Sequence, residues 1–483
     1  SLAPDHASAL QLRPLMSHAK VEPFTLLQFQ NVTEQKMVSA RRHFLFFQMG
    51  LGKTPTTVHA GYRTQQEVWL ILCPKNAIRT WEDHIKEWFE GLDQKTGRST
   101  DYAIHRWRRK YNNQQARRAM WSRRIPDCVN IYIMTFAGFV SDHEFVTLNP
   151  DIVIIDEAKR IRNRKSKAFE YLKVRCKNAR FFWPMTGTPG RQPQDLWTLF
   201  HLVDQKLYGS YWRFVNAYNH VIKNEWGRQE ILGLKNPDQW YWLLNQKASI
   251  VTKEMVKDQI GAAGIPIRRQ PLYVELDDCQ QRVYNDLAES MIAETPDGQL
   301  ILAPTSLVRD LRLRQLLVCP KILNPSFSYG SALEDLVETL QDTDPHVVIF
   351  TPFTQAFPFI AERLQLAGYT NIEFLSGGIT PDEQADRIAR FRARRGIMVC
   401  SILYAESFSL EPASECFFLG YEWDPDANRQ AEERLQRLTT GYPINAYYYG
   451  YEGTYDEHQM NVVCFKHQQA QFTFDVKKVG LKF

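Results

Sequence analysis

The segment "HFLFFQMGLGKTPTTVHA", residues 43 to 60, joins a short apolar run to a glycine-flanked lysine and then to a helix-like pattern. A nucleotide-binding loop needs glycines that admit phosphate oxygens to backbone N–H groups, a lysine for the outer phosphates, a hydroxyl for magnesium, and a helix N-terminus. Gly50, Gly52, Lys53 and Thr54 supply these groups in order. Because Phe47 stands where the full G-x-x-x-x-G-K-[ST] pattern has its first glycine, an ordinary strand–turn–helix remains the alternative.

Similar apolar runs recur along the chain in two series. The first is "FLFF" (44–47), "VWLILC" (68–73), "NIYIMT" (130–135), "DIVIID" (151–156) and "RFFWPMT" (180–186). The second is "HVVIFT" (346–351), "NIEFLS" (371–376), "GIMVCS" (396–401), "CFFLG" (416–420) and "NAYYYG" (445–450). Continuous apolar runs separated by helix-sized segments are typical of parallel sheets that helices cover on both faces. The sequence therefore predicts an α/β protein with two parallel-sheet lobes.

Between the two series, the chain is rich in Trp, Tyr, Leu and Gln at helical spacing. We interpret its aromatic residues as core rather than as a base-stacking platform, because apolar helix faces usually pack inward. The predicted division is an N-terminal extension (1–20), a first lobe (21–205), a mostly helical insertion and connection (206–330), and a second lobe with a C-terminal tail (331–483). Within the connection, "IGAAGIPIRRQP" (260–271) is typical of a loop entering a strand.

An acid pair follows the fourth run of the first series, in "DIVIIDEAKRIRN" (151–163). A hydrolase needs one carboxylate to hold a metal and another to orient or deprotonate the attacking water. Asp156 and Glu157, adjacent at a strand end, are suited to both roles. The alternative is an acidic turn, which the phosphate-binding pattern in the same lobe makes less attractive.

In the second lobe, "NRQAEERLQR" spaces Gln430, Arg434 and Arg437 along one face of a predicted helix. An arginine that reaches across a cleft stabilises the charge that develops on a γ-phosphate. The alternative is a solvated basic helix face.

Composition sets wider limits. The chain has 483 residues, of which 44% are hydrophobic and 23% charged, as in soluble proteins of two or three domains. No apolar run reaches membrane-spanning length, and the first 20 residues lack a signal-peptide pattern. The eight cysteines form no C-x-x-C pair, so a reducing cytosol is favoured.

The net charge of +5 is unevenly distributed. "RWRRKYNNQQARRAMWSRR" (106–124) holds eight basic residues and no acid, so it is either a solvated surface or a nucleic-acid contact.

Short motifs follow one another in a fixed order along the chain: "LLQFQ", "MGLGKT", "LCPKNAIRTWEDHIKEW", "IMTF", "DEAKRIRNRKSKAF", "MTGTPGRQPQDLWTLF", "LRLRQLLVCP", "VIFTPF", "YEWDPDANRQAEERLQR" and "EGTYDE". In these motifs and their order, the chain resembles the Swi/Snf-type motors of helicase superfamily 2 from about residue 20 to 460. Phe47 and Gln48 depart from the pattern, because the family usually has an acidic pair there. "SILYAESFSLEPAS" is the weakest match, with Ala405 and Ser407 at usual glycine positions.

The resemblance implies two RecA-like lobes that close over ATP and Mg²⁺. Gln30 would recognise adenine; Gly50, Gly52, Lys53 and Thr54 would hold phosphate; Thr54 and Asp156 would hold magnesium. Glu157 would act on water, and Gln430, Arg434 and Arg437 would complete the site. Thr186, Gly187 and Thr188 would couple nucleotide state to DNA. Candidate DNA contacts are Lys75, Thr135 and Ser401, with Arg106, Arg108, Arg109, Arg117 and Arg118 from the basic segment.

The leading interpretation is a DNA-stimulated ATPase that translocates on duplex or branched DNA as a monomer, remodelling it or displacing bound protein. A second interpretation is a helicase that separates strands or drives branch migration or fork reversal. A third is a DNA-binding scaffold without hydrolysis. A motor without recognisable reader domains would suit a bacterial or virus-infected cytoplasm, with a nuclear location left open and RNA not excluded as a partner.

Overall fold

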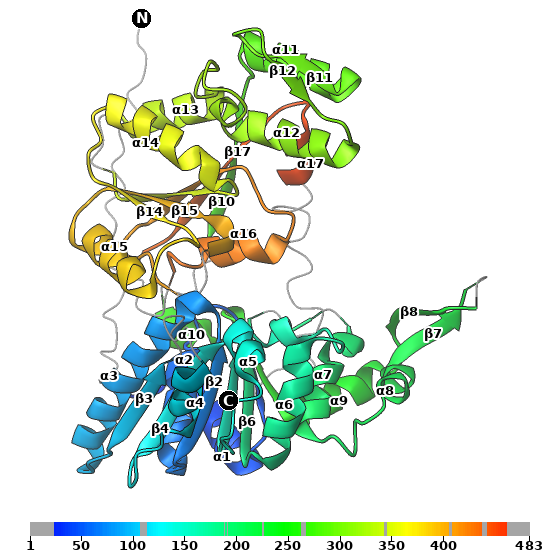
Figure 1. The fold of residues 1–483 in the computed structure, drawn as a ribbon, viewed down its shortest axis with the longest axis vertical. Helices are drawn as coiled ribbons and strands as arrows, with labels where there is room; N and C mark the ends of the chain where they lie inside the picture. Colours follow the sequence, from blue (N-terminus) through cyan, green and yellow to red (C-terminus); the bar gives the residue numbers. More distant parts are fainter. Residues whose placement is uncertain are drawn as a thin grey trace, which may run out of the picture.

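The computed structural model describes residues 24–106, 114–187, 189–190, 192–224, 227–261, 267–341, 345–404, 408–436 and 442–460. Two lobes lie one above the other, each built on a sheet with helices on both faces (Figure 1). The fold class predicted from the apolar runs is confirmed.

The first sheet has seven strands in the order β3-β4-β2-β5-β6-β1-β9, and neighbouring strands are parallel. The strands are β1 (Phe44–Phe47), β2 (Val68–Cys73), β3 (Tyr102–Arg106), β4 (Val129–Thr135), β5 (Ile152–Asp156), β6 (Phe181–Met185) and β9 (Ala248–Val251). Because the strands are parallel, their carboxyl ends meet at one edge, which faces the second lobe and receives the loops after β1 and β5.

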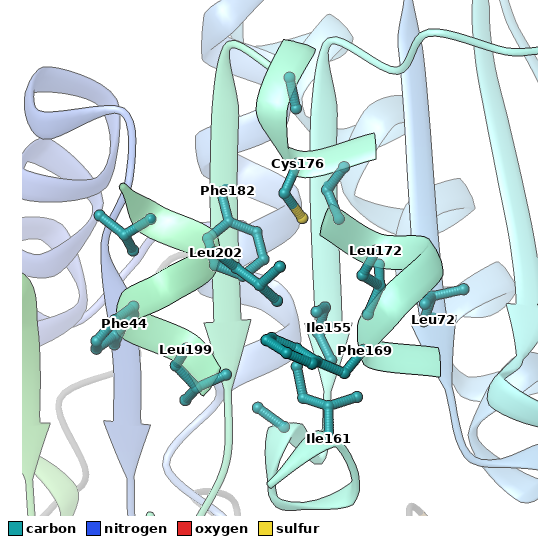
Figure 2. Close-up of a cluster of buried hydrophobic side chains, with 14 of the residues drawn as sticks. Phe44, Leu72, Ile155, Ile161, Phe169, Leu172, Cys176, Phe182, Leu199 and Leu202 are labelled. Atoms are coloured by element: carbon teal, nitrogen blue, oxygen red, sulfur yellow. The ribbon is translucent and has the colours of Figure 1, made fainter. Parts of the chain in front are cut away.

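Successive side chains of each strand enter different cores. Leu70 and Leu72 of β2 pack in one buried cluster, whereas Trp69 and Ile71 pack in the cluster on the opposite face. Helices cover both faces of the sheet, so strand residues that point to either face must be apolar. The apolar run along each strand is therefore continuous. Figure 2 shows part of the first cluster, where strand residues meet side chains of two helices.

The first lobe also contains α1 (Gln28–Ala40), α2 (Lys53–Thr64), η1 (Lys75–Ala77), α3 (Ile78–Thr96), α4 (Gln114–Ser122), α5 (Phe136–Asp142), η2 (Ala158–Ile161), α6 (Lys167–Asn178), η3 (Pro193–Leu196), α7 (Trp197–Val203), α8 (Tyr211–Tyr218), α9 (Pro237–Lys247), η4 (Glu254–Val256) and α10 (Lys257–Ile260). Beside α8, an antiparallel pair, β7 (Asn219–Lys223) and β8 (Gln229–Leu234), extends away from the lobe (Figure 1).

The second sheet has six parallel strands in the order β10-β17-β16-β13-β15-β14. They are β10 (Arg268–Val274), β13 (Val347–Thr351), β14 (Ile372–Leu375), β15 (Ile397–Ser401), β16 (Glu415–Leu419) and β17 (Asn445–Tyr451). Around them lie α11 (Asp278–Ser290), α12 (Ser306–Val318), η6 (Pro320–Ile322), α13 (Ser331–Leu340), η7 (Thr354–Ala356), α14 (Phe357–Leu366), α15 (Pro381–Ala393), η8 (Ile402–Tyr404), α16 (Pro425–Glu432) and α17 (Tyr455–Met460). A short antiparallel pair, β11 (Ile292–Glu294) and β12 (Leu300–Leu302), follows α11.

The segment 206–330 differs from the predicted helical insertion. Its strand β9 pairs with β1 in the first sheet, and its strand β10 pairs with β17 in the second. The first lobe therefore continues to α10, and the second begins at β10. The sequence pattern did not predict β9, because this strand follows α9 directly. Ala248 is both the C-cap of the helix and the first residue of the strand. Most of the buried aromatic residues of this segment join the first lobe's core, including Trp240 at 1% exposure.

Among the residues described above, no helix combines the length and apolarity that crossing a membrane requires.

Replacing a core residue of the first sheet should weaken the whole lobe. Ile154, at the centre of β5, is fully buried between strands and helices. Ile154→Ala should lower the free energy of unfolding by about 2–5 kcal/mol, because it leaves a cavity that the packed neighbours cannot fill. Chemical denaturation measures this loss. Val174→Ala, at an exposed position of α6, should change it by less than about 0.5 kcal/mol, and equal effects at both positions would contradict the assignment of Ile154 to the core.

Candidate nucleotide site between the two lobes

The loop after β1 has the backbone geometry of an anion cradle. Gly50 and Gly52 have φ angles of 78° and 74°, which residues with a Cβ rarely adopt. Gly52 caps α2, whose first two residues are Lys53 and Thr54, so the N-terminal N–H groups of this helix are directed at the loop. The Lys53 Nζ donates a hydrogen bond of 3.2 Å to the carbonyl oxygen of Phe47.

This loop lines a cavity of about 640 Å³ between the lobes. The first lobe contributes Gly50, Gly52, Lys53, Thr54, Trp81, Asp156 and Glu157, and the second contributes Gln384, Arg392 and Arg434. Both lobes therefore line the cavity: the first provides a lysine and two acids, and the second provides two arginines.

Asp156, the last residue of β5, is held by two donors. The Trp81 indole Nε1–H donates to its Oδ2 at 3.0 Å, and the backbone N–H of Glu157 donates to its Oδ1 at 3.0 Å. Burial, reinforced by the neighbouring Glu157 carboxylate, raises the pKa of Asp156 to about 6. A cation in the cavity would favour the ionised carboxylate and so lower the pKa of Asp156 again.

Glu157 has a left-handed backbone, with φ of 52° and ψ of 56°. This region is costly for a residue with a Cβ, by about 1–3 kcal/mol, and is found where the surroundings hold the chain at functional sites. Thr186, at the end of β6, donates from its Oγ1 to the Glu157 Oε2 at 3.3 Å. The buried carboxylate is thus fixed by its backbone and by a neighbouring strand.

Electrostatics at the cavity follow from these positions. Burial lowers the pKa of Lys53, while Glu157 and Asp156 oppose this effect and Arg434 adds to it. Lys53 and Arg434 therefore place two positive charges near two carboxylates, an arrangement that a polyphosphate anion with a bound cation would complete.

The predicted site residues of the second lobe do not lie together on one helix face, as the sequence had suggested. The helix α16 ends at Glu432, so Arg434 lies in the turn that follows rather than on the helix face with Gln430. The carbonyl oxygen of Arg434 accepts a hydrogen bond from Leu410 at 2.8 Å, which fixes this turn to its own lobe. Gln430 is buried in α16, and its Nε2 has no hydrogen-bond partner among the described residues. Arg437 lies outside the described residues.

Thr54 and Asp156 fit a magnesium ion by their chemistry. Both line the cavity that Lys53 also lines, and a hydroxyl with a carboxylate gives the hard oxygen ligands that Mg²⁺ prefers beside phosphates.

Comparison with known families decides the relationship. The model of the SNF2-related domain matches residues 30–322, and that of the helicase conserved C-terminal domain matches residues 330–439. The chain belongs to the SNF2-related family. This confirms the predicted Swi/Snf-type relationship within helicase superfamily 2.

Curated relatives of this SNF2-related chain are much longer proteins. The CHD3-type chromatin-remodeling factor CHR7 of Arabidopsis thaliana is 22% identical over 448 residues, which cover 86% of this chain and 34% of that protein. The chromodomain-helicase-DNA-binding protein 3 homolog of Caenorhabditis elegans is 22% identical over 455 residues, covering 85% and 24%. The chain thus spans about a third or less of these two relatives. Among solved structures, the SWI2/SNF2 ATPase core of Sulfolobus solfataricus in complex with dsDNA aligns with 94% of this chain and 93% of its own, at 19% identity and a TM-score of 0.42.

In this SNF2-related chain, two other predicted groups contact residues 48–52, the predicted phosphate loop, on the side away from the cavity. Gln30 of α1 donates from its Nε2 to the Leu51 carbonyl oxygen at 3.0 Å and accepts from the Leu27 N–H at 2.9 Å. It supports the loop without lining the cavity. At Gly187, a Cβ would lie 2.9 Å from the Met49 Sδ, so the segment after β6 packs directly on the loop. Thr188 lies outside the described residues.

The predicted DNA contacts are dispersed. Lys75 donates to the Ile379 carbonyl oxygen of the second lobe at 3.4 Å, and Arg106 approaches Asp382 of that lobe at 3.5 Å. Thr135 caps α5 by accepting from the Gly138 N–H.

The other candidates are internal to one lobe. Ser401 is buried at the end of β15. Arg117 pairs with the buried Asp142 at 3.3 Å, and the Arg118 guanidinium lies over the Phe145 ring. Arg108 and Arg109 lie outside the described residues.

Sequence reasoning missed several residues that organise the cavity. Trp81 lies within the segment "LCPKNAIRTWEDHIKEW", but its bond to Asp156 depends on how α3 packs against β5. Hydrogen bonds beside the phosphate loop join the two lobes through four further residues: Gln48, Lys253, Glu433 and Gln436. The one available signal was Gln48, because an amide there departs from the family's acidic residue.

The pKa of Asp156 gives a pH-dependent stability. Its folded value of about 6 exceeds its ordinary value of 3.8, so between these values the folded chain retains a proton that the unfolded chain releases. The free energy of unfolding, without nucleotide or magnesium, should therefore fall as pH rises through this window, by about 1 kcal/mol per pH unit. Urea denaturation at several pH values measures the slope. Asp156→Asn should flatten it, whereas Asp101→Asn, at an exposed position, should not; equal slopes for all three proteins would contradict the prediction.

Proposed function

We propose that this chain is an ATP-driven DNA motor whose hydrolytic site is completed only when the two lobes meet. One observation carries the proposal: a single cavity is lined by a phosphate-type loop and an acid pair from one lobe and by Arg434 from the other. The division matters because a change in the bound nucleotide then changes the energy of the interface between the lobes.

In this proposal each residue has a distinct task. The loop N–H groups and Lys53 bind the β- and γ-phosphates, while Thr54 and Asp156 hold magnesium, which neutralises phosphate charge when bound. Glu157 orients the attacking water and accepts its proton, and Thr186 keeps that carboxylate directed at the cavity. Arg434 stabilises the charge that develops on the γ-phosphate oxygens.

DNA is the proposed track. The two named relatives are a chromatin-remodeling factor and a homolog of a chromodomain-helicase-DNA-binding protein, so both bare duplex and nucleosomal DNA are candidate substrates. A motor that grips phosphates reads little sequence, and its affinity should fall steeply with salt.

Removing either half of the cavity should stop turnover. Lys53→Ala should reduce DNA-stimulated phosphate release to background, and Arg434→Ala should reduce it about 10³-fold, the lower range for such arginines. Lys177→Ala, at an exposed position of α6, is the matched control and should retain activity. Full activity in Lys53→Ala would exclude the proposed site. The preferred track is identified by measuring phosphate release at fixed salt with single-stranded, duplex, forked and four-way DNA, with nucleosomes and with RNA. Strand-displacement assays run in parallel distinguish translocation from unwinding.

The basic segment gives a separate test of the track. Charge reversal at Arg117 and Arg118 should lower DNA affinity and reduce the slope of log affinity against log salt by about one for each lost phosphate contact. Because Arg117 also pairs with buried Asp142, thermal unfolding must be measured on the same protein. An unchanged slope with reduced stability would assign both arginines to the fold alone.

A further inference from the structure

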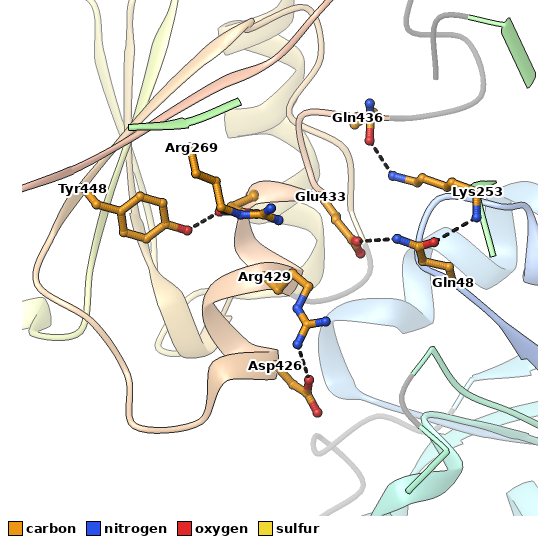
Figure 3. A network of polar contacts seen from close by, with 9 residues as sticks. Gln48, Lys253, Arg269, Asp426, Arg429, Glu433, Gln436 and Tyr448 are labelled. Atoms are coloured by element: carbon orange, nitrogen blue, oxygen red, sulfur yellow. Dashed lines mark hydrogen bonds and ion pairs between the residues drawn. The ribbon is translucent and has the colours of Figure 1, made fainter. Parts of the chain in front are cut away.

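The two lobes are joined at the phosphate loop by a small polar network (Figure 3). Gln48 directly follows β1 and uses both ends of its amide. Its Oε1 accepts from the Lys253 N–H at 2.8 Å, and its Nε2 donates to the Glu433 Oε1 of the second lobe at 3.4 Å. One side chain thus ties the phosphate loop to the segment after β9 and to the opposite lobe.

Lys253 forms the second connection across the interface. Its Nζ donates to the Gln436 Oε1 at 2.5 Å, and the two residues are only 9% and 1% exposed. A short hydrogen bond with an ionised donor, shielded from water, is among the stronger polar contacts of proteins. The Gln436 backbone also touches the loop, because a Cβ on Gly50 would lie 3.1 Å from its carbonyl oxygen.

These contacts flank the arginine of the cavity. Glu433 and Gln436 lie immediately before and two residues after Arg434, so holding both leaves the arginine little freedom to move. The first lobe therefore fixes the position of the residue with which the second lobe completes the cavity.

We infer that Gln48 and Lys253 are positioning residues that hold the turn 433–436 against the phosphate loop and thereby place Arg434 in the cavity. This inference rests on the proposed function and names the residues that convert lobe closure into a complete hydrolytic site. We call this set of four residues the latch: Gln48, Lys253, Glu433 and Gln436.

The chemistry of the latch requires an amide at position 48. A carboxylate there would still accept from the Lys253 N–H, but it would lose the donor to Glu433 and face that carboxylate at hydrogen-bond distance. Like charges at such a separation repel, so a change of one atom turns a closing contact into an opening one.

An exchange of the two groups provides the test. Gln48→Glu should lower kcat for DNA-stimulated hydrolysis about tenfold, the cost of losing one hydrogen bond to a charged group, with a smaller change in KM for ATP. Adding Glu433→Gln to that variant restores one donor and one acceptor with their direction reversed, so kcat should return to within about twofold of the original value. Lys253→Met, which keeps length and removes the donor, should also lower kcat. Gln94→Glu, an exposed helix position with the same charge change, should have no effect.

A second readout reports closure without turnover. Fluorophores carried by non-natural side chains at Val174 and Leu366, exposed positions of the two lobes, measure the distance between the lobes by energy transfer. Gln48→Glu and Lys253→Met should reduce the closed population, and the exchanged pair should restore it. Thermal unfolding of each variant separates loss of closure from loss of fold.

Each outcome decides the matter. Unchanged lobe distance and unchanged kcat in Gln48→Glu and Lys253→Met would overturn the inference, as would a doubly exchanged protein no better than Gln48→Glu. If the original chain showed no hydrolysis, the proposed function would fall, and the distance measurement alone would decide whether the latch closes the lobes.

Discussion

The strand ends of the first sheet face the helices α15 and α16 of the second lobe (Figure 1), and this arrangement imposes the constraint from which the site follows. Charged and polar groups concentrate at the carboxyl edge of the first sheet because the chain leaves every strand there into a loop. Lys53 and the acid pair thus lie at the same edge although about a hundred residues separate them in the chain. Placed alone in a low-dielectric gap, these charges would be costly. Opposite charges lie close together there, since Lys53 is near both carboxylates, while burial and the neighbouring Glu157 carboxylate raise the pKa of Asp156 to about 6.

The cavity is held by packing rather than by the loops alone. Trp81 comes from α3, whose apolar face covers one side of the sheet, and its indole reaches the end of β5 because that face is packed against the strands. Thr186 directly follows the neighbouring strand β6 and donates a hydrogen bond to the side chain of Glu157, whose backbone is left-handed. A weaker core would allow the Glu157 backbone to relax, so the geometry of the cavity and the stability of the lobe are linked through the same strands.

Much of this arrangement was predictable from the sequence, for identifiable physical reasons. The apolar runs gave β1 and β2 with their correct ends, because a strand buried on both faces has no polar position to blur its limits. Glycines and a lysine at fixed spacing identified the loop, since few other residues tolerate that backbone. The strand β9 was missed because it follows a helix without a turn residue, and its pairing with β1 is a long-range contact. The left-handed backbone of Glu157 and the turn that carries Arg434 were equally hidden, because both depend on packing between segments distant in sequence.

The polar contacts between the lobes differ in strength from one flank of the interface to the other. On one flank, Arg106 and Arg79 approach Asp382 at 3.5 and 4.0 Å, and the Asp382 side chain is 69% exposed. Such surface pairs contribute about 0–1 kcal/mol. Beside the phosphate loop, the bond between Lys253 and Gln436 is buried and short, in the class that contributes about 1.5–3 kcal/mol. Among these polar contacts of the described residues, the stronger ones therefore lie beside the loop. A ligand that shifts the loop would therefore act directly on the bond between Lys253 and Gln436, which is shorter and more buried than the pairs on the other flank.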